Sequence, residues 1–338
     1  MVSDTLNIQN MNRKRVFSGT RATGRLHLGN YLGAVKGYLE LQNNPEYEAI
    51  YMVMDLHAIT TPYDKEKLAQ NTRNVIMDYL ACGLDPKKSI ISAQSLVPEH
   101  PYLANIFASV VTIARMQHLP TFKDKVKQYP EGSTMALLNY PVLMAADILV
   151  YKAGLVPVGI DQEPHLEVAR EIARKMNEKY GTDFPEPVRF ATKGEYVPSL
   201  TGEGKMSKSV EGSFISLTDD LETIRKKVRA VPTATVAGGE MSVGVKTLFT
   251  FIDLLVPNDQ HAEELKDLFK SGKLMFSDLK DYVAETIFLK LQPIQEKRKY
   301  FEENPKTVDG IISEGAEKAR KIASETLKEV KEKMGFIG

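Results

Sequence analysis

The chain has 338 residues, of which 43% are hydrophobic, and its 44 basic and 44 acidic residues give a formal net charge of zero. That length is enough for a full core, in two domains or in one large domain with an appendage. A zero net charge excludes a protein whose whole surface attracts nucleic acid, so any such contact must come from local patches.

Cysteine count and hydropathy exclude further classes. Cys82 is the only cysteine, which excludes an intrachain disulfide framework, a cysteine-rich zinc knuckle and a cysteine-ligated iron–sulfur cluster. We therefore expect a reducing, cytoplasmic setting and no protein-bound zinc or iron–sulfur cluster. No stretch approaches the roughly 20 apolar residues of a membrane span, so no membrane association is expected, and residues 1–12 are interpreted as a polar tail.

The first half of the chain alternates short apolar runs with longer helical patterns. Apolar runs at 13–19, 49–58 and 89–94 are separated by helical patterns at 28–43 and 65–81. This is the βαβ order of a parallel sheet. We predict an α/β fold, with a Rossmann-like parallel-sheet domain over residues 13–217 and a mainly helical region over residues 218–338.

A helical insertion is expected to split this sheet at about residues 75–145. Residues 99–151 indicate two helices around a polar loop at 121–133, followed by a strand at 155–160 and a helix at 164–179. In open parallel sheets, ligands bind beyond the carboxyl ends of the strands. Residues 55–57, Gln94 and residues 159–162 would lie there.

The segment HLGN, His27–Asn30, follows the first predicted strand and begins a helix. His27 and Asn30 can donate hydrogen bonds to phosphate, Gly29 lets a flat base approach the backbone, and the helix adds its positive N-terminal end. The simpler interpretation of a single helix-start histidine is an ordinary cap or surface residue.

The segment KMSKS, Lys205–Ser209, follows the flexible residues 201–204. Lys205 and Lys208 on one polar segment can follow a leaving pyrophosphate, whereas a solvated basic loop is the simpler alternative. The order and spacing of HLGN and KMSKS together indicate adenylate chemistry on ATP.

These two motifs resemble those of the class I aminoacyl-tRNA synthetases. Three further stretches, at 18–34, 138–171 and 315–329, resemble the bacterial tryptophanyl-tRNA synthetases, so the resemblance spans nearly the whole chain. MAADIL followed by VPVGIDQ is its most specific part after KMSKS. The resemblance implies activation of L-tryptophan by ATP, transfer of the tryptophanyl group to the 3′ end of tRNA(Trp), anticodon contacts from residues 218–338, and a homodimer with an interface partly in the insertion.

The same resemblance implies an amino-acid pocket in which Asp147 accepts the indole N–H, because that group can only donate. A salt bridge within a helix is the alternative for Asp147, and core packing is the alternative for two other pocket residues, Met144 and Phe17. The remaining implied pocket residues are Tyr140, Gln162 and His57.

For ATP, the resemblance implies catalytic roles for His27, Asn30, Lys205 and Lys208, with Mg2+ carried by the ATP phosphates and no metal ligated by the protein. Further ATP contacts are implied for Arg21, Ala22, Thr23, Gly29, Gly159, Ile160, Asp161, Val197, Met206, Ser207 and Ser209. Two departures affect this set, because residues 21–23 stand where many bacterial members carry Gln-Pro-Ser, and Ile160 stands where they often have a glutamate.

Three alternatives remain at this point. A tyrosyl-tRNA synthetase also recognises a polar ring atom with an acidic side chain, although MAADIL and the segment from Gly315 favour tryptophan. A small-molecule adenylyltransferase shares a similar helix start, but it would need neither KMSKS nor the helical C-terminal region. A catalytically inactive, synthetase-like RNA-binding protein would not need an intact HLGN and both KMSKS lysines.

Overall fold

The computed structural model describes residues 13–128, 133–192, 194, 196–208, 210–234 and 239–337. The predicted polar tail at 1–12 and Ser209 of KMSKS lie outside the described residues. Within the described ranges, no helix is both long and apolar enough to cross a membrane.

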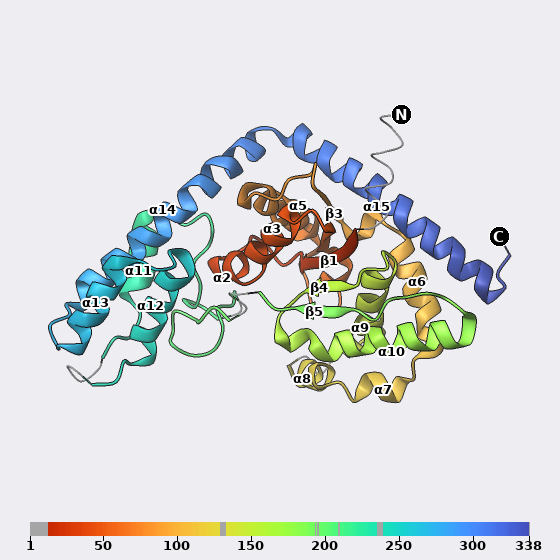
Figure 1. Cartoon of the computed structure of the whole chain (residues 1–338), viewed down its shortest axis with the longest axis horizontal. Helices are drawn as coiled ribbons and strands as arrows, with labels where there is room; N and C mark the ends of the chain where they lie inside the picture. Colours follow the sequence, from red (N-terminus) through yellow and green to blue (C-terminus); the bar gives the residue numbers. More distant parts are fainter. Residues whose placement is uncertain are drawn as a thin grey trace.

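Five parallel strands form one sheet in the order β3-β2-β1-β4-β5 (Figure 1). The order reverses between β1 and β4, so the carboxyl ends of these two neighbouring strands form the switch point at which such sheets bind ligands. The parallel α/β sheet is therefore confirmed. The strands are β1 (Lys14–Arg21), β2 (Tyr47–Met54), β3 (Ser89–Ala93), β4 (Leu155–Pro157) and β5 (Val188–Phe190).

Two predicted helices of the first half are confirmed. Residues 28–43 form a continuous helical segment made of α2 (Leu28–Asn30), a π-helical turn (Tyr31–Val35) and α3 (Lys36–Asn43). Helix α5 (Lys65–Cys82) begins after Asp64, whose side chain accepts the Glu66 N–H, and it ends at Gly83 in the left-handed conformation at φ 109°. These are a common N-cap and a common C-cap of helices.

The structure corrects two expectations about the first half. Residues 55–57 lie beyond the end of the strand as expected, because β2 ends at Met54 and α4 (Asp55–Ala58) follows. The insertion does not begin near residue 75, because α5 and β3 belong to the sheet unit and the extra helices lie between β3 and β4. Residues 121–128 of the predicted polar loop belong to helix α8 (Pro120–Gln128), whose residues are all at least partly exposed, so its polarity reflects exposure rather than a lack of helix.

The helices between β3 and β5 lie mainly below the sheet in the view of Figure 1. Besides α8 they are α6 (Glu99–Phe107), α7 (Ile113–Gln117), α9 (Met135–Leu149) and α10 (Glu163–Tyr180). Strand β5 is only three residues long, which is too short for a recognisable alternation in the sequence.

The C-terminal region is helical, as predicted, and it packs directly on the sheet unit. Helices α14 and α15 form an arch over the molecule in Figure 1, with α14 packed on α5 and α11, and α15 packed on β3 and α6. One apolar face of α15, formed by Ile322, Leu327, Val330 and Met334, lies against the core. The helices of this region are α11 (Leu221–Arg229), α12 (Val243–Leu255), α13 (Gln260–Lys270), α14 (Phe276–Glu303) and α15 (Pro305–Met334).

Gly315 allows α15 to lie directly on β3. A Cβ built on Gly315 would lie 2.0 Å from the carbonyl oxygen of Ile91, whereas a Cβ on Gly310 of the same helix would meet nothing within 4 Å. The Ser92 hydroxyl also donates to the carbonyl of Ile312, at 2.9 Å. The C-terminal helix is thus fixed to the edge of the sheet by backbone contact.

We predict opposite effects for alanine at these two glycines. Gly315→Ala should lower the free energy of unfolding by about 1–3 kcal/mol because α15 must move away from β3. Gly310→Ala, the matched control, should raise it by about 0.5–1 kcal/mol through helix propensity. Urea denaturation followed by circular dichroism measures both, and a Gly315→Ala protein as stable as the wild type contradicts the packing argument.

Candidate active site

The HLGN segment forms the start of the helical segment that follows β1, with His27 as the N-cap of α2. The Asn30 side-chain oxygen accepts the His27 backbone N–H at 3.1 Å, which fixes the start of the helix. The His27 side chain is buried, and its Nδ1 has no hydrogen-bond partner among the described residues. Burial lowers the pKa of His27 to about 4, with smaller contributions from Lys208 and Lys205, so the imidazole is neutral at pH 7.

Gly29 provides the space that His27 and the KMSKS segment occupy. A Cβ on Gly29 would lie 2.9 Å from the His27 ring and 3.1 Å from the Met206 Cβ. The Gly29 N–H donates to the Met206 sulfur at 3.2 Å. In this structure the glycine is therefore needed for close contact between the two motifs, a reason that the sequence did not suggest.

The KMSKS segment lies against HLGN and against the loop that follows β1. The Met206 N–H donates to the carbonyl of Val197 at 2.9 Å. The Lys208 ammonium donates to the carbonyl oxygens of Thr23 and Arg25, at 3.1 and 2.9 Å. Burial lowers the pKa of Lys208. Two motifs separated by almost two hundred residues thus form one site.

The ATP residues predicted near β4 also lie at this site. A Cβ on Gly159 would lie 2.5 Å from the Asp161 carboxylate and 3.8 Å from the Lys205 ammonium, so Lys205 lies beside the turn after β4. Ile160 is 60% exposed. The other predicted ATP residues differ in exposure. Thr23 is exposed, and Ser207 is half-buried, with its carbonyl accepting the Ser213 hydroxyl. Ala22 and Val197 are buried in the core.

Arg21, at the end of β1, adds positive charge to this side of the sheet. Its guanidinium donates to the Thr61 hydroxyl at 2.9 Å. Burial, together with the charge of Arg21, lowers the pKa of Lys125 on α8, so these two cations are close enough to influence each other. The arrangement favours a polyanionic group near the end of β1.

Asp147 of α9 is the centre of a fully buried polar cluster. Its Oδ1 accepts from Gln94 Nε2 at 2.7 Å and from His100 Nδ1 at 2.6 Å, and its Oδ2 accepts from His57 Nε2 at 2.8 Å. Burial by itself raises the pKa of Asp147, but the hydrogen bonds from His100 and His57 outweigh it and the net effect is a lowered pKa. Asp147 is therefore ionised, and it is not part of an ordinary helix salt bridge.

Two residues of this cluster, His100 and Tyr151, were not predicted. An ionised carboxylate can only accept, so His100 donates from Nδ1, and the Tyr151 hydroxyl lies 2.7 Å from the His100 Nε2. The Tyr151 ring stacks on Phe17 with centroids 5.4 Å apart. Phe17 is 3% exposed and Met144 packs beside the same core.

A second polar cluster involves Tyr140 and Gln162. The Asp161 carboxylate accepts from Gln162 Nε2 at 2.6 Å, so Gln162 Oε1 faces His165 and accepts from its Nδ1 at 3.0 Å. His165 Nε2 therefore accepts a hydroxyl proton, and the hydroxyls of Tyr140 and Thr121 lie 2.7 and 2.8 Å from it. The Tyr140 ring also meets the His57 ring edge-on at 6.3 Å, which joins the two clusters.

His165 and Thr121 were also missed by the sequence reasoning. Four of the six histidines, His27, His57, His100 and His165, lie in this region, and three of them are in otherwise apolar stretches. This enrichment of histidine is the one sequence signal that could have indicated His165, and no such signal indicated Thr121. Among the described residues, no group of three or more His, Cys, Asp or Glu could hold a metal ion.

Comparison with known proteins agrees with this geometry. The family model described as tRNA synthetases class I (W and Y) matches residues 9–292, so the fold and the two motifs are those of a class I tRNA synthetase. The chain is 41% identical over 335 residues to a tryptophan–tRNA ligase of Helicobacter pylori, covering 97% of this chain and 100% of that one.

Solved structures show the same relationship. The tryptophanyl-tRNA synthetase of Campylobacter jejuni, complexed with ADP and tryptophan, gives a TM-score of 0.83 at 32% identity and covers 95% of this chain and 100% of its own. The tyrosyl-tRNA synthetase of Archaeoglobus fulgidus, complexed with L-tyrosine, gives 0.67 at 25% identity and covers 86% and 92%. The chain belongs to the tryptophan–tRNA ligase family of aminoacyl-tRNA synthetases, which confirms the predicted family, fold and enzyme class.

The buried neutral His165 predicts a pH-dependent stability. Burial lowers its pKa to about 4, against 6.5 as the ordinary value. Between pH 4 and pH 6.5 the unfolded chain binds more protons at this residue than the folded chain does. The contribution of His165 to the free energy of unfolding is therefore complete above pH 6.5 and is lost as the pH falls to 4. The full loss amounts to about 3 kcal/mol.

We therefore expect His165→Asn to destabilise the protein more at pH 7.5 than at pH 4.5, by about 2 kcal/mol. Urea denaturation at the two pH values measures the difference. The exposed His118 gives the control, since His118→Asn should show no such change. An equal effect of His165→Asn at both pH values contradicts the burial of a neutral imidazole.

Proposed function

We propose that this protein activates L-tryptophan with ATP and then transfers the tryptophanyl group to the 3′ end of tRNA(Trp). The observation that supports the proposal is an ionised, buried acceptor, Asp147, in a chain whose HLGN and KMSKS segments contact each other. Asp147 suits an N–H donor on an apolar ring, and the HLGN and KMSKS segments suit the phosphates of ATP. The family relationship supports both substrates.

Asp147 has one acceptor position left for a ligand. A carboxylate offers about four lone-pair positions, and Gln94, His100 and His57 occupy three of them. The free position is on Oδ2, where His57 donates. Asp147 is 0% exposed while the His57 side chain is 10% exposed, so an entering indole reaches Oδ2 by sharing it with His57 or by turning that ring aside.

The other proposed pocket residues come from the same hydrophobic cluster and from the second polar cluster. Phe17 and Met144 supply apolar contact, and Tyr140 and Gln162 are held at fixed orientations by His165. An indole N–H left without an acceptor in such a site would cost binding energy, so a buried carboxylate favours the ring that carries the donor. A tyrosine hydroxyl can also donate, and therefore the relatives, rather than Asp147 alone, favour tryptophan.

The first step requires no general base. The amino-acid carboxyl group has a pKa near about 3.5, so it is already ionised when it attacks the α-phosphate. An oxygen–phosphorus bond forms to the carboxylate while the bond to pyrophosphate breaks. Catalysis then depends on position and on charge stabilisation.

We assign that stabilisation to His27, Asn30, Lys205 and Lys208. The neutral imidazole of His27 keeps one N–H to donate, and Lys208 uses two of its three N–H groups on backbone carbonyls, which leaves one for phosphate. Arg21 adds permanent charge. Mg2+ enters as part of the ATP complex, held by the phosphates rather than by a dedicated protein site.

The helical region 218–338 is proposed to contact the tRNA anticodon, and the chain is proposed to form a cytoplasmic homodimer. Several large apolar side chains of the insertion are exposed, which supports an interface there. They are Leu96, Tyr102, Ile113 and Met135. Gel filtration with light scattering tests the dimer, and a monomer at micromolar concentration contradicts it.

We predict that the purified protein exchanges pyrophosphate into ATP with tryptophan, and with tyrosine at least ~100-fold less efficiently. Asp147→Asn should raise the KM for tryptophan by about 10- to 100-fold, with little change in the KM for ATP, because it removes a charge-assisted acceptor. Asp267→Asn, at an exposed aspartate, is the control.

Other outcomes would redirect the assignment. Exchange with tyrosine alone indicates a tyrosyl enzyme, and exchange without charging of tRNA(Trp) indicates a small-molecule adenylyltransferase. Undetectable exchange with retained RNA binding indicates an inactive relative.

A further inference from the structure

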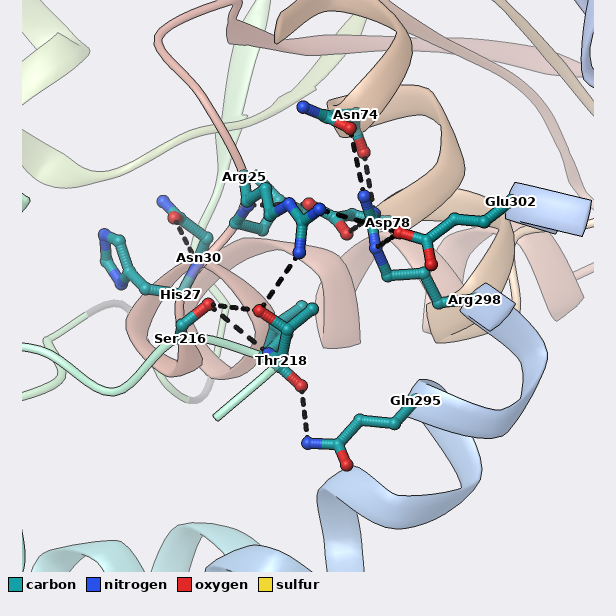
Figure 2. A network of polar contacts seen from close by, with 12 residues as sticks. Arg25, His27, Asn30, Asn74, Asp78, Ser216, Thr218, Gln295, Arg298 and Glu302 are labelled. Atoms are coloured by element: carbon teal, nitrogen blue, oxygen red, sulfur yellow. Dashed lines mark hydrogen bonds and ion pairs between the residues drawn. The ribbon is translucent and has the colours of Figure 1, made fainter. Parts of the chain in front are cut away.

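Helix α14 is linked to both backbone segments of the proposed ATP site by two side chains three residues apart, directly by Gln295 and through Asp78 by Arg298. Residues at this spacing share one face of a helix. Figure 2 shows both side chains directed from α14 toward the HLGN region and the segment that follows KMSKS. Neither residue belongs to a sequence motif.

Arg298 reaches the HLGN segment through Asp78 of α5. Both side chains are at most 2% exposed, and the Arg298 guanidinium donates to Asp78 Oδ1. Asp78 Oδ2 accepts the backbone N–H of Leu26 at 2.7 Å, and Leu26 directly precedes His27. The position of the catalytic histidine thus depends on a buried carboxylate that is itself held by α14.

Several contacts fix the Arg298 guanidinium (Figure 2). It donates to the Asn74 carbonyl and side-chain oxygens at 3.2 and 3.0 Å, and to Glu302 at 3.0 Å. Burial raises the pKa of Asp78 to about 6, and Arg298 is the largest opposing influence, so the ionised carboxylate depends on Arg298. The charge of Asp78 also acts on Lys208 of KMSKS.

Gln295 reaches the other wall of the site. Its side-chain NH2 donates to the carbonyls of Leu217 and Asp219, both at 2.9 Å. The same segment pairs with HLGN, because the Leu28 N–H donates to Ile215 at 2.8 Å and the Leu217 N–H donates to Leu26 at 3.4 Å. Gln295 therefore contacts one of two bonded backbone segments directly, and Arg298 contacts the other through Asp78.

We infer that Gln295 and Arg298 are positioning residues for ATP, through which α14 couples the placement of the helical region to the geometry of HLGN. Neither side chain contacts the Asp147 cluster in the contacts described above, so their loss should affect ATP and leave tryptophan binding intact. A merely structural role would weaken both ligands together. This inference rests on the proposed function, since it takes HLGN as the phosphate site.

The test compares ATP and tryptophan affinities, each measured alone by titration calorimetry, and the KM values in pyrophosphate exchange. The variants are Arg298→Gln, Arg298→Lys and Gln295→Ala. Arg225→Gln is the matched control, because it breaks an exposed ion pair between α11 and Glu285 of α14, at 2.7 Å, that lies outside this network.

We expect Arg298→Gln to weaken ATP binding at least about tenfold and Gln295→Ala about threefold, with tryptophan affinity within about twofold of the wild type. Arg298→Lys should be intermediate, because an ammonium can pair with Asp78 but cannot reproduce the fork of contacts. The control should match the wild type for both ligands.

Equal weakening of ATP and tryptophan, or ATP affinity unchanged in Arg298→Lys and Gln295→Ala, overturns the inference. If thermal melting shows that Arg298→Gln does not fold, the ATP and tryptophan affinities of Arg298→Lys and Gln295→Ala decide whether the inference holds. Absence of tryptophan-dependent exchange in the wild type is a separate result, which contradicts the proposed function. In that case the ATP titrations of the variants still test whether α14 affects ATP binding at HLGN.

Discussion

A carboxylate shielded from solvent must be hydrogen-bonded, and Asp147 accepts from donors in three different parts of the chain. His57 follows β2, Gln94 follows β3, and His100 lies on α6, while Asp147 itself comes from α9. An unpaired charge at this position would be costly, so these elements must come together when the chain folds. The proposed amino-acid site is therefore organised at the carboxyl ends of the strands by the need to pair one buried charge.

A second buried carboxylate organises the ATP half in a similar way. Asp78 accepts from the backbone before His27 and pairs with Arg298 of the helical region. Both carboxylates act by position, because neither is required to transfer a proton. This agrees with a reaction in which an ionised substrate attacks a phosphate and the protein mainly orients groups and stabilises charge.

The sequence predicted those parts of the structure that depend on local pattern or short motifs. Alternating apolar runs predicted the parallel sheet, and HLGN, KMSKS and Asp147 marked the site. Strand β5 was missed because three residues give no period, and α8 was mistaken for a loop because an exposed helix is as polar as a loop. Local pattern cannot separate these cases.

The missed site residues share a different cause. Arg298 and Asp78 are 220 positions apart, and His100 and Tyr151 are 51 apart, so only the folded chain shows that they meet. The orientation of Gln162 and the proton position on His165 depend on a chain of partners that begins at Asp161. Such roles follow from three-dimensional contacts and have no signature in the sequence.

The most direct test of the proposed function is whether Asp147 accepts a hydrogen bond from the indole N–H of tryptophan. The chain contains no tryptophan, so ligand fluorescence can be followed without background, and calorimetry can follow a tryptophan analogue in which sulfur replaces the N–H. The wild type should bind tryptophan about 10- to 100-fold more tightly than this analogue, and the preference should largely disappear in Asp147→Ala. Equal affinities for the two ligands in the wild type would contradict the central role given to this carboxylate.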